Sequence, residues 1–241
     1  LFGQILVFRS IGELLKKKTS SKLRKEALHL LHLLLNCSTV LSKFCCGCKE
    51  ECVDVSNDAE STSTMQGFSR ILDGLADCLT CCGGDIHDVK LRKRAIITLA
   101  YLFSSGKSGF EILMYRKSTA ETNFLLLILQ AVVSEMDVVL ASHSSDPADC
   151  VKARTLLIRE ALILLNRLVS SPVYSATILL LLTSSRDMAS LALDIASRSP
   201  RKDPKCRQFK NSLQREGESE IIGLIQVFRK RIFAYFGDAT Q

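Results

Sequence analysis

The hydrophobic residues of this chain recur every three or four positions over most of its length, with short polar breaks between the apolar stretches. This spacing places apolar side chains on one face of an α-helix. It predicts helices over Phe2–Lys18, Lys22–Asn36, Val40–Cys46, Met65–Cys82, Asp88–Ser105, Lys107–Arg116, Thr122–Ser142, Ala148–Ser170, Val173–Thr183, Ser185–Ser197 and Ser219–Phe236. The pattern therefore predicts an all-α fold of about ten helices.

A short motif recurs in two of these helices. Lys25–Leu31 and Arg159–Leu165 share a charged pair, an alanine and paired leucines. Helix pairs also recur at a spacing of about 40–50 residues, which is near the HEAT/armadillo period. We therefore expect a HEAT/armadillo-like solenoid that forms one helical-repeat domain over residues 1–241. An ordinary α-helical bundle is the alternative, and its smaller radius of gyration would distinguish it in solution scattering.

Two segments differ from this pattern. Residues 47–64 are polar, acidic and rich in Ser and Thr, which predicts a long mobile loop. Residues 199–205 contain Pro200 and Pro204 around a mostly basic centre, which predicts a linker before the last helix.

The composition narrows the class of protein. Of the 241 residues 47% are hydrophobic, 6% are aromatic and none is Trp, which is typical of an aliphatic helical core. The best candidate for a membrane span, residues 124–140, carries Gln130, Glu135 and Asp137, so we expect no membrane partner. The ten Cys are spread through a chain long enough to form a core without disulfides, which favours a reducing, intracellular compartment. Because the sequence begins with Leu, we expect a fragment or a processed form.

Motifs of catalysis are weak. The run from Ser104 to Ser108 resembles the end of a phosphate-binding loop, but Tyr101 stands where that loop needs a glycine and a helix precedes it. We therefore predict a glycine turn between two helices. His29 and His32 lie one helical turn apart without an apparent third metal ligand. No nucleophile elbow, dinucleotide fingerprint or paired-carboxylate site is present, so we expect no enzyme and no cofactor.

A cysteine cluster has partial zinc-site spacing. Cys48 and Cys52, then Cys78 and Cys81, form two pairs about 25 residues apart. The second pair falls inside a predicted amphipathic helix, and no knuckle of Gly or aromatic residues surrounds either pair. Incidental cysteines in a loop and a helix end are the alternative that we prefer, so no metal ligand is predicted.

Basic residues form several clusters, and the net charge is +7. The clusters comprise Lys16–Lys18 with Lys22, Arg24 and Lys25; Lys90 with Arg92–Arg94; Arg198 to Arg207; and Arg229–Arg231. Solvated helix faces explain most such runs, but phosphate contacts of a nucleic acid would use them too. Direct nucleic-acid binding is therefore the alternative function.

The last helix carries more aromatic residues than one apolar stripe needs. The candidate partner-binding residues are Phe228, Arg229, Lys230, Arg231, Phe233, Tyr235 and Phe236. Aromatic and Arg side chains are the common anchors of protein interfaces. Capping of the helical core by these aromatics is the alternative interpretation.

The stretches Val151–Leu168, Ser185–Leu191 and Leu23–Asn36 together resemble the C-terminal helical-repeat region of the ATR-interacting protein family, in its plant form. The resemblance implies a non-catalytic regulatory subunit that binds a phosphatidylinositol-3-kinase-like checkpoint kinase, ATR, through helical repeats. It also implies a nuclear role in the DNA damage response, with homodimer formation as a further expectation. The acidic segment and the coiled coil of that family are absent from this sequence, so binding to the single-strand-binding protein RPA is not carried over.

Overall fold

The structure is a computed structural model, and it describes residues 2–50, 70–81, 84–115, 123–141, 147–198 and 212–238. These residues form α-helices, and no β-strand occurs among them. The predicted all-α class is confirmed. The chain divides into two compact units, Leu1–Leu127 and Ile128–Gln241. The expectation of one domain over residues 1–241 stays a prediction.

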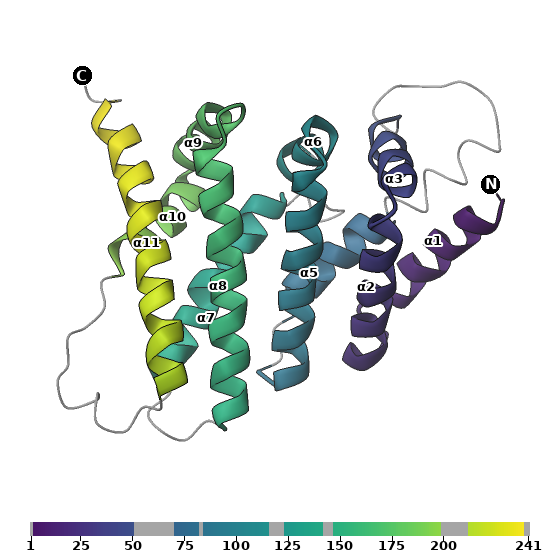
Figure 1. Cartoon of the computed structure of the whole chain (residues 1–241), viewed down its shortest axis with the longest axis horizontal. Coiled ribbons are helices and arrows are strands. Elements are labelled where there is room, and N and C mark those ends of the chain that lie inside the picture. The colour runs from purple at the N-terminus through teal and green to yellow at the C-terminus, as the bar shows by residue number, and fades with distance from the viewer. Residues whose placement is uncertain are drawn as a thin grey trace. The chain divides into compact units, whose positions relative to one another are not determined.

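Unit 1 contains the N-terminal helices (Figure 1). They are α1 (Phe2–Leu14), α2 (Ser21–Leu35), α3 (Ser38–Glu50), a helical stretch over residues 70–79, α5 (Ile86–Ser104), α6 (Lys107–Tyr115) and the start of α7 (Phe124–Ala141). Helix α3 extends four residues into the predicted loop at 47–64, and residues 51–64 lie outside the described residues.

Local sequence signals explain where several of these helices begin. The Ser20 hydroxyl accepts a hydrogen bond from the backbone N–H of Leu23 and so caps the start of α2. Asp85 caps α5 by accepting from the N–H of Asp88 at 2.8 Å. Gly106 has φ +92 between α5 and α6, so the predicted glycine turn is confirmed and no phosphate-binding loop forms there.

Unit 2 contains the rest of α7, α8 (Ala148–Ser170), α9 (Ser175–Ser184), α10 (Arg186–Ser197) and α11 (Ser212–Asp238). Helix α8 lies at its centre, and its Leu157, Leu164 and Leu168 are fully buried. The α8 helix packs on α9 and α11, and α10 packs on both α9 and α11. The predicted linker at 199–205 lies outside the described residues.

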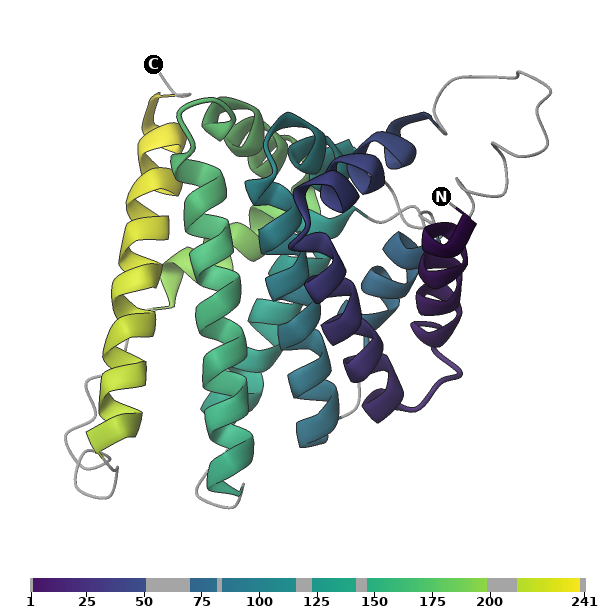
Figure 2. The same cartoon turned by 45° about the vertical axis from the view of Figure 1, so that its right-hand side comes forward.

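Long helices begin at nearly equal intervals along the chain. The first residues of α2, α5, α8 and α11 are Ser21, Ile86, Ala148 and Ser212. Within unit 1, α2 and α5 lie side by side and run in the same direction (Figures 1 and 2). Within unit 2, α8 and α11 have the same arrangement. Each interval is longer than the HEAT/armadillo period that we predicted, because it holds a long helix and the shorter helices that return the chain.

Helix α7 is the most apolar element described. By length and composition alone it could cross a membrane, with a mean hydropathy of 2.1, and two sharply bent helix pairs would raise the number of such spans to three. Half of the apolar window in α7 is buried in the protein. Its Glu135 is 1% exposed and forms a 2.6 Å ion pair with Arg154 of α8. The absence of a membrane partner stays a prediction.

Candidate protein-interaction surface on the last helix

Helix α11 is held in unit 2 by one side of its cylinder. Ile225, Phe228 and Ile232 are at most 9% exposed and lie on one stripe, as the spacing of three and four residues requires. This stripe faces the core of unit 2. It places Phe228 in the core, so Phe228 is not available on the surface for a partner.

Polar contacts hold α11 against α8. The side-chain amide of Asn166 donates a 2.9 Å hydrogen bond to the backbone carbonyl of Leu224. Near the start of α11, Arg159 Nε and Glu220 Oε2 form an ion pair at 2.8 Å. The two contacts lie about one helical turn apart along α11. They therefore define which side of α11 faces solvent.

The opposite side of α11 exposes both apolar and basic groups. Val227 is 47% exposed and Phe233 is 43% exposed. The Arg229 guanidinium lies over the Phe233 ring, 5.4 Å from its centroid, in a cation–π contact. A shallow, open depression of about 390 Å³ is lined by Gln226, Arg229, Lys230 and Phe233. A side chain of a partner could enter it.

The other residues predicted for this site are distributed around it. Arg231 is exposed and Tyr235 is partly exposed, while the Phe236 side chain lies outside the described residues. Gln226 and Val227 were not predicted. Their signal was present, because Gln226 lies four and seven residues before Lys230 and Phe233, and Val227 lies three residues before Lys230.

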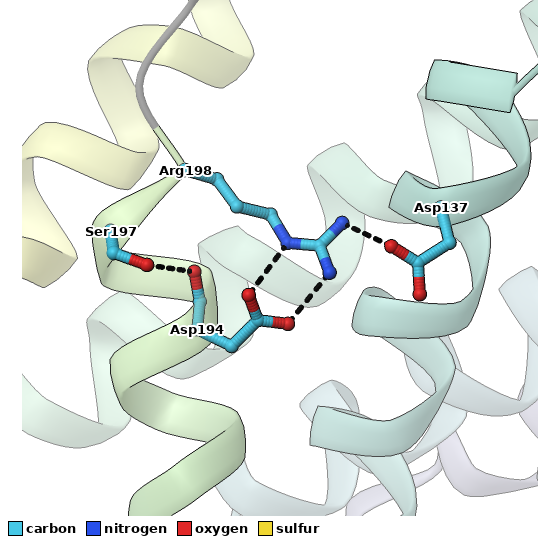
Figure 3. A network of polar contacts seen from close by, with 4 residues as sticks. All are labelled: Asp137, Asp194, Ser197 and Arg198. Carbon is cyan, nitrogen blue, oxygen red and sulfur yellow. Dashed lines mark hydrogen bonds and ion pairs between the residues drawn. The ribbon is translucent and has the colours of Figure 1, made fainter.

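Arg198, which the sequence placed in a basic cluster, is occupied within the protein (Figure 3). It closes the end of α10 by pairing with Asp194 at 2.6 Å and reaches Asp137 of α7 at 2.7 Å. Burial acts to lower the pKa of Arg198, but the hydrogen bonds to the two carboxylates outweigh it and raise the pKa above its usual value. Arg198 therefore links the end of α10 to α7. The other residues of that basic cluster lie outside the described residues.

Arg24 is likewise buried, at 2% exposure, in unit 1. Its guanidinium donates to the thiol sulfurs of Cys78 and Cys81, each at 3.4 Å, and to the backbone carbonyl of Leu15 at 3.2 Å. Burial raises the pKa of the Cys78 thiol to about 12, so this thiol stays protonated at neutral pH. These contacts join α1, α2 and residues 70–79.

No group of three or more His, Cys, Asp or Glu side chains among the described residues could hold a metal ion. Of the cysteines with zinc-site spacing, Cys78 and Cys81 contact Arg24 instead. The side chains of Cys48 and Cys52 lie outside the described residues.

Comparison with known proteins identifies the family. The SUV2 middle domain is matched over residues 1–81, and the SUV2 C-terminal domain is matched over residues 88–241, which is more than half of the chain. The chain belongs to the SUV2 family. The curated Protein SENSITIVE TO UV 2 of Arabidopsis thaliana is 44% identical over 239 residues, covering 97% of this chain and 36% of that relative. The chain thus spans about a third of the relative's length, and no solved structure matches it.

This finding corrects the resemblance to the ATR-interacting protein family, because both matched domains and the curated relative are SUV2. The resemblance rested on helix patterns such as that of Val151–Leu168. An apolar stripe with leucines three and four residues apart occurs in many packed helices, so it does not distinguish families.

Proposed function

We propose that this chain is a non-catalytic scaffold of helical repeats that binds a protein partner in the response to ultraviolet damage. The name of the Arabidopsis relative, Protein SENSITIVE TO UV 2, supports the process. The exposed cation–aromatic surface of α11 supports the binding role, and it is the observation that carries the proposal. A helix whose far side is fixed in a core presents such a surface with little loss of conformational entropy on binding.

Regular spacing supports the repeat architecture. Long helices begin at nearly equal intervals, and in each unit two of them lie side by side in the same direction. The recurring motif lies in α2 and in α8. Its alanine and last leucine, Ala27 and Leu31 in α2 and Ala161 and Leu165 in α8, are buried in both. Stacked repeats of this kind bury a continuous core and expose long surfaces for partners.

The partner that we propose is a phosphatidylinositol-3-kinase-like checkpoint kinase such as ATR, with the nucleus as the place of action. This choice is supported by the proposed role in the response to ultraviolet damage. Ultraviolet light damages DNA, and checkpoint kinases act in the DNA damage response.

The test is binding of the purified kinase to this chain by surface plasmon resonance. Phe233→Ser removes the exposed ring and its contact with Arg229, and we expect affinity to fall about 30-fold, as for an interface hot spot of about 2 kcal/mol. Lys230→Glu should slow association most at low salt. Leu180→Ser is the matched control, since Leu180 is 58% exposed on α9.

Circular dichroism must show that each variant keeps its helices. Full affinity of a folded Phe233→Ser variant would remove α11 as the contact. Failure of the unaltered chain to bind the kinase at all would remove the kinase as the partner.

Direct nucleic-acid binding is the second candidate, because Lys17, Lys18 and Lys22 are all exposed between α1 and the first turn of α2. Titration with single- and double-stranded DNA at two salt concentrations tests it. Binding through phosphates weakens steeply as salt rises, and Lys17→Glu with Lys18→Glu should abolish it. Binding that survives physiological salt would support this candidate, and its disappearance would leave the scaffold.

A further inference from the structure

Helix α2 exposes a row of leucines. Leu23, Leu30 and Leu33 are 53%, 44% and 53% exposed. They recur at intervals of seven and three residues, so they lie on one face of the helix. We call this face the α2 edge. The neighbouring residues of α2, among them Ala27, Leu28 and Leu31, are buried and fix the orientation of the helix.

The α2 edge points away from α5, the helix beside it in unit 1. His32 marks the side that faces α5, because its ring contacts the Tyr101 ring edge-on with centroids 5.3 Å apart. Successive residues turn by about 100° around a helix, so Leu23 and Leu30 lie about 180° and 200° from His32. Leu23 and Leu30 are therefore on the outer side of the pair formed by α2 and α5, and Leu33, about 100° from His32, lies between the two sides.

The equivalent leucines of α8 have the opposite environment. When Lys25–Leu31 is aligned with Arg159–Leu165, Leu23 corresponds to Leu157 and Leu30 corresponds to Leu164. Leu157 and Leu164 are both 0% exposed. In α8 these two leucines pack inside the protein, whereas the aligned Leu23 and Leu30 of α2 are exposed to solvent.

Charges around the α2 edge restrict what could pack on it. Lys17, Lys18 and Lys22 are exposed near its start, while Glu26 on the edge is paired with Lys25 at 3.6 Å. A second copy packed parallel to the first would bring lysines against lysines, which is unfavourable. An antiparallel copy would separate them, and the sedimentation experiment described below tests that arrangement. A helix with an apolar stripe and acidic flanks would match both the leucines and the lysines.

We propose that the α2 edge is a second docking surface, and that it binds an amphipathic helix of a partner protein whose apolar stripe is flanked by Asp and Glu. The surface is distinct from α11, and the proposal holds whether or not the kinase is the partner of α11. Leucine contacts supply the affinity, and the lysines set the preference for acidic flanks.

The test uses two fluorescent synthetic helices of about 20 residues with the same leucine stripe, one flanked by Glu and one by Lys. Fluorescence anisotropy measures their binding to this chain. We expect the Glu-flanked helix to bind at least about tenfold more tightly than the Lys-flanked helix, with a difference that shrinks as salt rises. Changing both Leu23→Ser and Leu30→Ser should weaken binding by about 30-fold, because two half-exposed leucines lose their contact.

Leu180→Ser, at another exposed leucine, should leave binding unchanged. The edge variant should keep its helicity, since both leucines are exposed, and circular dichroism checks this. Failure of the Glu-flanked helix to bind, or equal binding by the edge variant, overturns the proposal. If sedimentation shows that the unaltered chain self-associates and the edge variant does not, a second copy is the occupant, and this result would also overturn the proposal.

Photo-crosslinking in the full-length Arabidopsis relative completes the test, with the reactive group at the position aligned with Leu30. A crosslink to a different protein is the expected result. A crosslink within the same polypeptide would mean that another part of that longer chain covers the edge, and it would overturn the proposal.

Discussion

The two leucines that share one place in the recurring motif should respond very differently to truncation. Leu164 is 0% exposed in α8, whereas Leu30 is 44% exposed in α2. Leu164→Ala removes a fully buried side chain and leaves a cavity, which costs about 3–4 kcal/mol of the free energy of unfolding. Leu30→Ala removes a side chain that is only about half buried, at a site that water can fill, so the cost is about 1 kcal/mol or less.

Urea unfolding followed by far-ultraviolet circular dichroism measures both effects. With an m value of about 2–3 kcal/mol/M, Leu164→Ala should lower the midpoint by about 1–2 M and Leu30→Ala by less than about 0.5 M. The two leucines lie in different compact units, and the unaltered chain is the reference for both variants. Unchanged m values would show that the effect lies in stability and not in the compactness of either state.

Equal losses at the two positions would refute the reasoning. They would show that the α2 edge is covered in solution, or that the α8 site collapses around the missing side chain. Sedimentation of the unaltered chain and of the Leu30→Ala variant distinguishes these outcomes. If a second copy covers the α2 edge, the unaltered chain sediments as a dimer.

Three further predictions follow from the polar groups. Glu135→Gln should cost about 3–5 kcal/mol in urea unfolding, because it removes the carboxylate charge that faces the buried Arg154 guanidinium, while replacing both partners with apolar residues should cost far less. Iodoacetamide should modify the exposed Cys37, whose pKa is lowered mainly by a hydrogen bond from Thr39, well before the buried Cys78, as mass spectrometry would show. Burial, with nearby positive charges, lowers the pKa of His32 below 6.5, so the unfolded chain binds this proton first and stability falls as pH drops below 6.5. His32→Gln should flatten that fall in unfolding curves at about pH 7.5 and 5.5. Protection of Cys37, rapid alkylation of Cys78 or a pH dependence that persists without His32 would contradict these assignments.

Much of the last helix could be predicted from its sequence. The spacing of Ile225, Phe228 and Ile232 is that of one buried stripe, and all three are buried. Phe233 lies five residues after Phe228, about 140° around the helix, which predicts its exposure. A count of aromatic residues makes both Phe228 and Phe233 surface candidates, whereas their angles around the helix separate the buried Phe228 from the exposed Phe233.

Contacts between distant parts of the chain were not predictable in this way. Arg24 and Arg198 were read as members of basic clusters, yet each is held by side chains of other helices. Their partners are far from them in the sequence, as Cys78 is from Arg24 and Asp137 is from Arg198. A charge pattern along one helix contains no information about which groups another helix brings to it.

By itself the sequence determined the helical class and the turn at Gly106, because apolar spacing and glycine conformation are local properties of the chain. Only the tertiary structure decided which apolar stripe has a neighbour. Aligning the motif pairs Leu23 and Leu30 of α2 with Leu157 and Leu164 of α8. The two leucines of α8 are buried, while the two of α2 face water. Periodicity defines a face on a helix, but burial depends on whether another element packs against that face, and this is a property of the assembled fold.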